Sequence, residues 1–361
     1  MKCIAHLTAV GLLLTLPAAA HTPQQPPHQL YSEGDLKLES GEAIKDFSIS
    51  YVTHGTLNAK KSNAILMVTA ISGNHHRLDF MIGPGKALDP DKYFIICTDA
   101  IANGFSTSPS NSKAQPRMQF PKFTIRDMVQ SQYRLMKEKF GIDHVVAVIG
   151  PSMGGMQTLQ WGVSHPGMMD ALVALTPMAR TAPWSIAVNH ATRRALMLDP
   201  AFKDGRYTTQ PEAGWRLRAD VLQVLATRTP EAMRQQFPDP MAVLPWIEAQ
   251  ENGVVKSGFD ANDWIAQTWA YDRHNVGDTS PAFGGDPAQA LHTVRSHALL
   301  MSGELDLYNP VEDGIAAAAA IPGGQHVTIP SMQGHVAASA GFHAEDLTFI
   351  NATVRAFLGE N

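Results

Sequence analysis

A serine at residue 152 stands in a sequence context that suits a nucleophile. Residues 150–154 read G-P-S-M-G, after an apolar run at 145–149 and before a helical window at 156–163. Glycines on both sides let neighbouring backbone approach a tight turn, and a helix that begins after the serine favours negative charge near its first N–H groups. We therefore predict that Ser152 attacks a carbonyl carbon from a strand-to-helix turn.

A nucleophilic serine needs a base, and the base needs a carboxylate that orients it. In this strand-to-helix context the carboxylate follows the serine in the sequence. Asp306 follows the apolar run at 298–301 by a short loop, at the carboxyl end of a late strand. Sites collect at that edge of a parallel sheet. Asp306 is the predicted acid, and Glu304 and Asp313 are weaker alternatives.

A histidine late in the chain is placed to act as the base. His335 follows the strand-like run at 325–329. His326 lies inside that run and His343 lies one helical stretch later, so both are better explained as structural or exposed residues. We predict that His335 takes the proton of the serine while the acid fixes its tautomer.

Two backbone N–H groups are expected to stabilise the oxyanion. One belongs to Met153, directly after the nucleophile, and the second to Ile71, in the loop after the apolar run at 64–70. The same loop contains His75 and His76, but no pattern of further ligands accompanies this pair. We expect no metal and no cofactor.

The supporting elements follow from the hydrophobic pattern. Near-continuous apolar runs, which alternate with helical windows, predict a mostly parallel sheet with crossover helices. Between residues 124 and 140 apolar side chains recur at helical spacing, with Thr124 and Asp127 as a capping pair and Gly141 as the end. The runs lie at residues 64–70, 93–98, 145–149, 171–175, 298–301 and 325–329.

The pattern changes after Arg180. Strand-like runs stop there and return near Ser296, and five of the six tryptophans fall in between. Helical windows fill this part of the chain. We expect a helical lid inserted over the sheet.

The charge balance excludes some partners. The chain has 28 Lys+Arg against 33 Asp+Glu, a formal net charge of −5, and no run of basic residues. This argues against a nucleic-acid or anionic membrane surface. We expect a small-molecule partner, an acyl ester or acyl donor.

The first residues have the features of a cleavable export signal. Lys2 precedes a short apolar stretch at 9–16 and the three alanines at 18–20. The stretch is shorter than the roughly 20 apolar residues of a membrane span. We expect cleavage after Ala20, a periplasmic or secreted protein with no membrane attachment, and a flexible start at 21–28.

Several segments resemble the homoserine O-acetyltransferase family. The most specific are G-P-G-K-A-L-D at 83–89 and K-Y-F-I-I-C at 92–97. The resemblance implies an α/β-hydrolase fold with a helical lid, a serine that is acylated, acyl transfer to an alcohol, and a homodimer. Ser152, Asp306 and His335 fall on the family's nucleophile, acid and base. The similar segments are 51–58, 63–73, 82–97, 123–129 and 152–161.

The expected class is therefore α/β, with one core interrupted by the lid. The parts are the signal peptide at 1–20, the first part of the α/β-hydrolase core at 21–180, the lid at 181–290 and the second part of the core at 291–361.

The chain departs from the family at three places. Pro151 replaces a common glycine, and Val336 stands where the family commonly has an aspartate that binds the amino-acid substrate. The substrate-binding arginine of the family's lid follows a P-x-x-G segment, which residues 211–214 match here. The spacing after this segment does not align with the family, and Arg228 is taken as the counterpart. Export would also separate the enzyme from acyl-CoA, which is cytoplasmic.

Three functions fit these residues. An exported esterase, in which water releases the acyl group, reconciles the triad with the signal peptide and with Val336. An O-acyltransferase that uses acyl-CoA shares the acyl-enzyme and differs in the final nucleophile. A non-catalytic binding protein on the same fold is the third, and the complete set Ser152, Asp306 and His335 argues against it.

Overall fold

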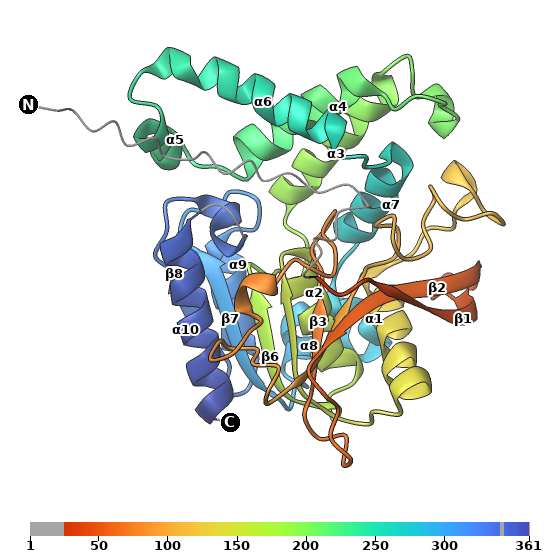
Figure 1. The fold of residues 1–361 in the computed structure, drawn as a ribbon, viewed down its shortest axis with the longest axis vertical. Coiled ribbons are helices and arrows are strands. Elements are labelled where there is room, and N and C mark those ends of the chain that lie inside the picture. Colours follow the sequence, from red (N-terminus) through yellow and green to blue (C-terminus); the bar gives the residue numbers. More distant parts are fainter. Residues whose placement is uncertain (1–24, 340–342, 361) are drawn as a thin grey trace, which may run out of the picture.

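An eight-stranded sheet forms the centre of the computed structural model, which describes residues 25–339 and 343–360 (Figure 1). The expected signal peptide lies outside the described residues. The strand order is β1-β2-β4-β3-β5-β6-β7-β8, and β3 to β8 run parallel, as predicted. The strands are β1 Gln29–Lys37, β2 Ala43–His54, β3 Ala64–Val68, β4 Phe94–Thr98, β5 Val145–Pro151, β6 Met169–Leu175, β7 His297–Gly303 and β8 Gln325–Ile329.

The central strands are apolar throughout because helices cover both faces of the sheet. In β3, Leu66 and Val68 join the core on the α1 and α2 side, whereas Ile65 and Met67 join the core on the α10 side. No helix of the described residues has the length and apolar character needed to cross a bilayer. The helices are α1 Ile125–Arg134, α2 Met153–Ser164, α3 Pro183–Leu198, α4 Glu212–Ala219, α5 Pro230–Gln236, α6 Val243–Lys256, α7 Ala261–Asp272, α8 Pro287–Leu291, α9 Val311–Ala320 and α10 Ala344–Glu360.

Helices α3 to α7 follow β6 in the chain and lie together over one end of the sheet, at the top of Figure 1. They fall within the range 181–290 that the sequence assigns to a lid. Helix α8 begins inside that range, but it contacts α2 and α9 below the lid helices. The insertion therefore places five helices above the carboxyl ends of the parallel strands.

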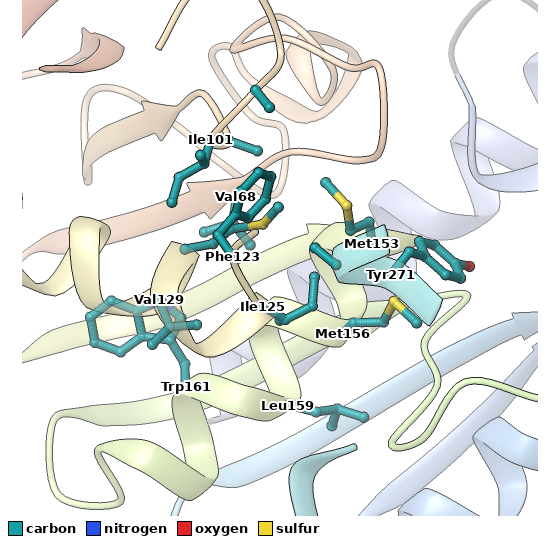
Figure 2. Packing of buried hydrophobic residues seen from close by; sticks show 14 of the residues in the cluster. Val68, Ile101, Phe123, Ile125, Val129, Met153, Met156, Leu159, Trp161 and Tyr271 are labelled. Carbon is teal, nitrogen blue, oxygen red and sulfur yellow. The ribbon is translucent and has the colours of Figure 1, made fainter. Parts of the chain in front are cut away.

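Helix α1 begins where its capping pair predicts. The Thr124 hydroxyl accepts the Asp127 N–H, and the Asp127 carboxylate accepts the Thr124 N–H. The helix continues as a π-helix, Leu135–Phe140, and ends at Gly141 with a φ of +59°. Figure 2 shows apolar side chains of α1 and α2 in the core, among them Ile125, Val129, Met156 and Trp161.

The N-terminal part contains a hairpin that the sequence pattern does not reveal. The hairpin β1–β2 is not predicted, because β1 is mostly polar and exposed at the sheet edge. The sequence also predicts a flexible start at 21–28. Of these residues the structure describes 25–28, where the Gln25 amide donates to Asp79 Oδ2 at 3.0 Å and the ring centroids of His28 and Phe105 are 5.3 Å apart. These contacts bring the N-terminal segment to the loops that follow β3 and β4.

A buried carboxyl group lies between β1 and α1. The Glu33 side chain is fully buried, and its oxygens accept no hydrogen bond from the described residues. Arg134 Nη1 is 3.6 Å from Glu33 Oε2. Burial raises the pKa of Glu33 from 4.5 to about 8, although Arg134 opposes this shift.

The raised pKa of Glu33 makes stability depend on pH. Between its ordinary pKa and its folded pKa the folded state holds a proton that the unfolded state releases, so this group destabilises the fold as pH rises from about 4.5 to about 8. Glu33→Gln should raise the thermal midpoint at about pH 8 more than at about pH 5. Thermal unfolding followed by circular dichroism measures this, with the exposed Glu42→Gln as control. An equal effect at both pH values would contradict the assignment.

Candidate active site

The turn between β5 and α2 holds Ser152 in a strained conformation. Its φ is +56° and its ψ is −120°, in the left-handed half of the backbone map that non-glycine residues rarely adopt. The Ser152 N–H donates to Leu175 O at 2.8 Å and contacts Thr176 Oγ1 at 3.2 Å. These bonds to the end of β6 hold the strained turn in place.

The flanking glycines are required by close approach of the backbone. A Cβ at position 150 would lie 2.5 Å from Gly154 O, and a Cβ at position 154 would lie 2.6 Å from Val68 O. Any larger residue would push α2 away from β3. Pro151 is tolerated as the last residue of β5.

A continuous hydrogen-bond chain joins the three predicted residues. His335 Nε2 lies 2.9 Å from Ser152 Oγ, and His335 Nδ1 lies 2.7 Å from Asp306 Oδ2. The three side chains come from the loops after β5, β7 and β8, at the carboxyl edge of the sheet. This arrangement can carry a proton from the serine to the imidazole.

The acid has a fixed orientation. Asp306 Oδ1 accepts the backbone N–H groups of Tyr308 and Asn309, each at 2.8 Å, which leaves Oδ2 for the histidine. The Asp306 side chain is fully buried. Of the three acids considered from sequence, Asp306 is the one bonded to His335.

The two predicted oxyanion donors lie on the loops beside the serine. Met153 is the first residue of α2, so its N–H has no acceptor within the helix. Ile71 lies in the turn after β3, which the Gly73 N–H closes on Ala70 O at 2.9 Å. Ile71 also lines the cavity that contains Ser152.

The cavity above the triad has a volume of about 590 Å³, which is enough for a small organic ligand. It is bounded by the loop after β3, by lid residues and by the His335 turn. Its walls carry both apolar and charged side chains, among them Ile71, Leu222, Phe259, Val336, Arg77, Arg218, Asp79, Asp260 and Asp263.

The structure does not bring Arg228 to this cavity. Its guanidinium instead lies 5.6 Å from the centroid of the Trp246 ring. Arg218 lines the cavity, only 3% exposed, 3.8 Å from the centroid of the Trp264 ring. Sequence reasoning missed Arg218, although it stands four residues after Gly214 in the P-x-x-G segment of the lid.

Arg218 is a buried cation with no anionic partner among the described residues. It forms no ion pair with any described carboxylate, and its Nε has no acceptor among the described residues. Burial lowers the pKa of Arg218 to about 9, so it remains charged at neutral pH. Such a group favours an oxygen-rich or anionic ligand.

The tandem histidines each face a carboxylate. His75 Nδ1 lies 2.6 Å from Asp99 Oδ2, and His76 Nδ1 lies 2.9 Å from Asp79 Oδ2. Within residues 25–339 and 343–360, no three acidic, histidine or cysteine side chains gather as metal ligands. The side chains of the His75–Asp99 pair are fully buried.

Asn309 joins the acid loop to the lid. Its side chain accepts the Tyr271 hydroxyl of α7 at 2.5 Å and donates to Thr176 O at 2.7 Å. Its N–H holds Asp306. Burial raises the pKa of Tyr271 well above its ordinary value, and the hydrogen bond to Asn309 opposes this.

A second connection to the lid runs through Tyr308. Its hydroxyl donates to Asn189 Oδ1 at 2.5 Å, and its carbonyl accepts the Ser185 hydroxyl at 2.6 Å, both on α3. Its ring meets the edge of His335 at 5.0 Å between centroids. The loop that carries the acid is therefore attached to α3 and to α7.

We predict that Tyr271 positions the triad through Asn309. Tyr271→Phe removes a buried hydrogen bond of the acid loop and should lower kcat by roughly tenfold with little change in KM. Steady-state ester hydrolysis measures both constants. Tyr207→Phe is the matched control, because Tyr207 donates at 2.6 Å to Asp260 in the lid and does not contact the acid loop. Equal losses in both variants would show a general effect on lid stability instead.

Comparison with known proteins places this geometry in a family context. A family model described as the alpha/beta hydrolase fold matches residues 63–339. An ethyl acetate hydrolase of Pseudomonas veronii is 33% identical, over 86% of this chain and 89% of that protein. A homoserine O-acetyltransferase of Methanosalsum zhilinae is 40% identical over 78% of this chain, which spans 62% of that longer protein.

A solved structure is also similar over nearly the whole chain. It is an acetylester hydrolase from Corynebacterium glutamicum, 30% identical in sequence, with a TM-score of 0.85. The alignment covers 92% of this chain and 96% of that one. Hydrolases and acyltransferases are thus both among the similar proteins.

Proposed function

Because this chain belongs to the α/β-hydrolase fold family, in the branch that contains homoserine O-acetyltransferases and acetyl esterases, we propose that it is a serine esterase acting on acetyl esters. One observation carries this function: the hydrogen-bond chain from Asp306 through His335 to Ser152 opens on a cavity of about 590 Å³. The similarity to an ethyl acetate hydrolase and to an acetylester hydrolase supports the substrate class.

The reaction follows from this geometry in two halves. Ser152 Oγ attacks the ester carbonyl while His335 Nε2 takes its proton, and Asp306 stabilises the resulting imidazolium. The N–H groups of Met153 and Ile71 receive the oxyanion. His335 then protonates the leaving alcohol, and a water molecule, deprotonated by the same imidazole, releases acetate from the acyl-enzyme.

The residue after the base favours water as the final nucleophile. Val336 lines the cavity and is 8% exposed. The homoserine O-acetyltransferase family commonly has an aspartate at this position, which binds the amino-acid substrate. A valine offers no charge to an incoming ammonium group, so acyl transfer to homoserine is disfavoured.

A second function, O-acyl transfer to an alcohol, is favoured by Arg218. A buried guanidinium with no ion pair among the described carboxylates can receive the carboxylate of an acceptor. The similarity to a homoserine O-acetyltransferase points the same way. The two functions share the acyl-enzyme and differ in which nucleophile resolves it.

Product analysis separates the two functions. We expect purified protein to release acetate from ethyl acetate faster than it forms O-acetylhomoserine from acetyl-CoA and homoserine. Ser152→Ala should lower acetate release by several orders of magnitude. Ser164→Ala, at the far end of the same helix and outside the cavity, is the control. O-acetylhomoserine formation that outpaces hydrolysis would establish the acyltransferase function instead.

We also propose that the enzyme is exported to the periplasm or secreted. Lys2, the apolar stretch at 9–16 and the alanines at 18–20 support this. When the whole chain is expressed in a Gram-negative host, N-terminal sequencing of the periplasmic protein should begin at His21. Ala20→Phe should retain the signal, because the cleavage site requires small residues. Wild-type protein that keeps residues 1–20 in the cytoplasm would contradict export.

A further inference from the structure

A second guanidinium lines the cavity next to the turn that carries the base. Arg77 lies in the loop after β3, and its Nη2 donates to Ser339 Oγ at 2.6 Å. The Ser339 N–H in turn donates to Val336 O at 2.9 Å, at the end of the 3-10 helix Gly334–Ala338. Arg77 is therefore held against the turn on which His335 and Val336 stand.

Arg77 has no anionic partner among the described residues. No described carboxylate forms an ion pair with it, and its buried Nε has no acceptor there. Burial lowers the pKa of Arg77 to about 10, which still leaves it charged at neutral pH. A cation in a confined cavity is stabilised when an anion enters and accepts its hydrogen bonds.

The carboxylates on the lid wall of the cavity already have donors. Asp263 accepts both the N–H and the hydroxyl of Ser110, and burial raises its pKa well above the ordinary value. Asp260 accepts the Tyr207 hydroxyl at 2.6 Å and the Gln210 amide at 2.9 Å. Ser110 of the core thus occupies Asp263, and two lid side chains occupy Asp260, so neither acid pairs with Arg77 among the described residues.

Asp79, on the same loop as Arg77, also lines the cavity, but it bonds His76 and Gln25 and forms no ion pair with Arg77 among the described residues. Its Oδ2 lies 2.9 Å from His76 Nδ1 and accepts the Gln25 amide at 3.0 Å. Its Oδ1 is buried without a hydrogen-bond donor in the described part of the chain. The loop thus presents a guanidinium toward the His335 turn and a carboxylate toward His76.

The position of Arg77 indicates which part of a substrate it meets. His335 hands its proton to the leaving alcohol, so that alcohol departs beside the His335 turn. Arg77 is bonded to the last part of this turn through Ser339. In the homoserine O-acetyltransferase family, an aspartate commonly stands at the position of Val336 and receives the ammonium group of the substrate. Here Val336 is neutral and a guanidinium stands nearby.

We propose that Arg77 binds a carboxylate on the alcohol portion of the ester, so that the preferred substrates are acetyl esters of hydroxy acids; this rests on the esterase function proposed above. The anionic alcohol is held beside His335, where it is protonated and leaves. An alcohol that carries an ammonium group is repelled by the same guanidinium. Arg77 is thus a specificity residue, and the chemistry at Ser152 is unchanged.

Three small esters that differ in charge test this assignment. Acetoxyacetate is anionic, acetoxyacetamide is its neutral counterpart, and acetylcholine is cationic. Acetate release gives kcat/KM for each ester with wild-type protein and variants. The ratio of kcat/KM for acetoxyacetate to that for acetoxyacetamide should fall by roughly tenfold or more in Arg77→Met, mostly through KM. Arg77→Lys should retain part of this preference, because it keeps the charge.

Ser339→Ala is the matched control. It removes the bond that holds Arg77 against the turn, but it keeps the guanidinium in the cavity. If Arg77 acts only by supporting the turn, Ser339→Ala and Arg77→Met will lower kcat on all three esters together and leave the ratios unchanged, which would overturn the proposal. If the ratio of kcat/KM for acetoxyacetate to that for acetoxyacetamide is the same in wild-type protein and in Arg77→Met, the proposal is overturned as well.

The same assay distinguishes failure of this inference from failure of the esterase function. Ser152-dependent acetate release from acetoxyacetamide, without any effect of Arg77 on charge preference, contradicts the carboxylate site alone. Absence of Ser152-dependent acetate release from every ester contradicts the esterase function and the carboxylate site together.

Discussion

The hydrogen-bond chain Asp306–His335–Ser152 is the contact on which the other features of this site depend. Its three side chains are far apart in sequence, and they meet because the strands β5, β7 and β8 run parallel and end at one edge of the sheet. The hydrogen-bond chain also needs a turn that places Ser152 at a φ of +56°. The close packing at Gly150 and Gly154 and the bond to Leu175 O maintain that turn.

The lid does more than cover the sheet. Through Tyr271 on α7 and through the α3 residues that bond Tyr308, it holds the loop that orients Asp306. The same helices bring Arg218 into the cavity. A displacement of the lid would therefore alter the acid loop and the binding walls together, so substrate binding and triad geometry are physically linked.

Much of this arrangement could be predicted from local patterns. The apolar runs predicted the parallel sheet, and the strand-to-helix context of G-P-S-M-G placed Ser152 before Asp306 and His335. The catalytic roles of these residues stay a prediction. Arg77 could not be found in this way, because lining a cavity depends on how the chain packs and leaves no local pattern. The same holds for β1, which pairs at the sheet edge despite its polar sequence. It also holds for Arg228, which the sequence offers as counterpart of the family's lid arginine but which packs beside Trp246. For Arg218 the one local signal was its place four residues after Gly214.

The central claim is that Ser152 forms the acyl-enzyme, and covalent trapping tests it most directly. Treatment with a fluorophosphonate ester, followed by peptide mass mapping, should find one adduct, on the peptide that contains Ser152, in proportion to the esterase activity lost. A slowed reaction in His335→Ala would show that the imidazole activates this serine. An adduct on another residue, or complete inactivation with Ser152 unmodified, would contradict the account.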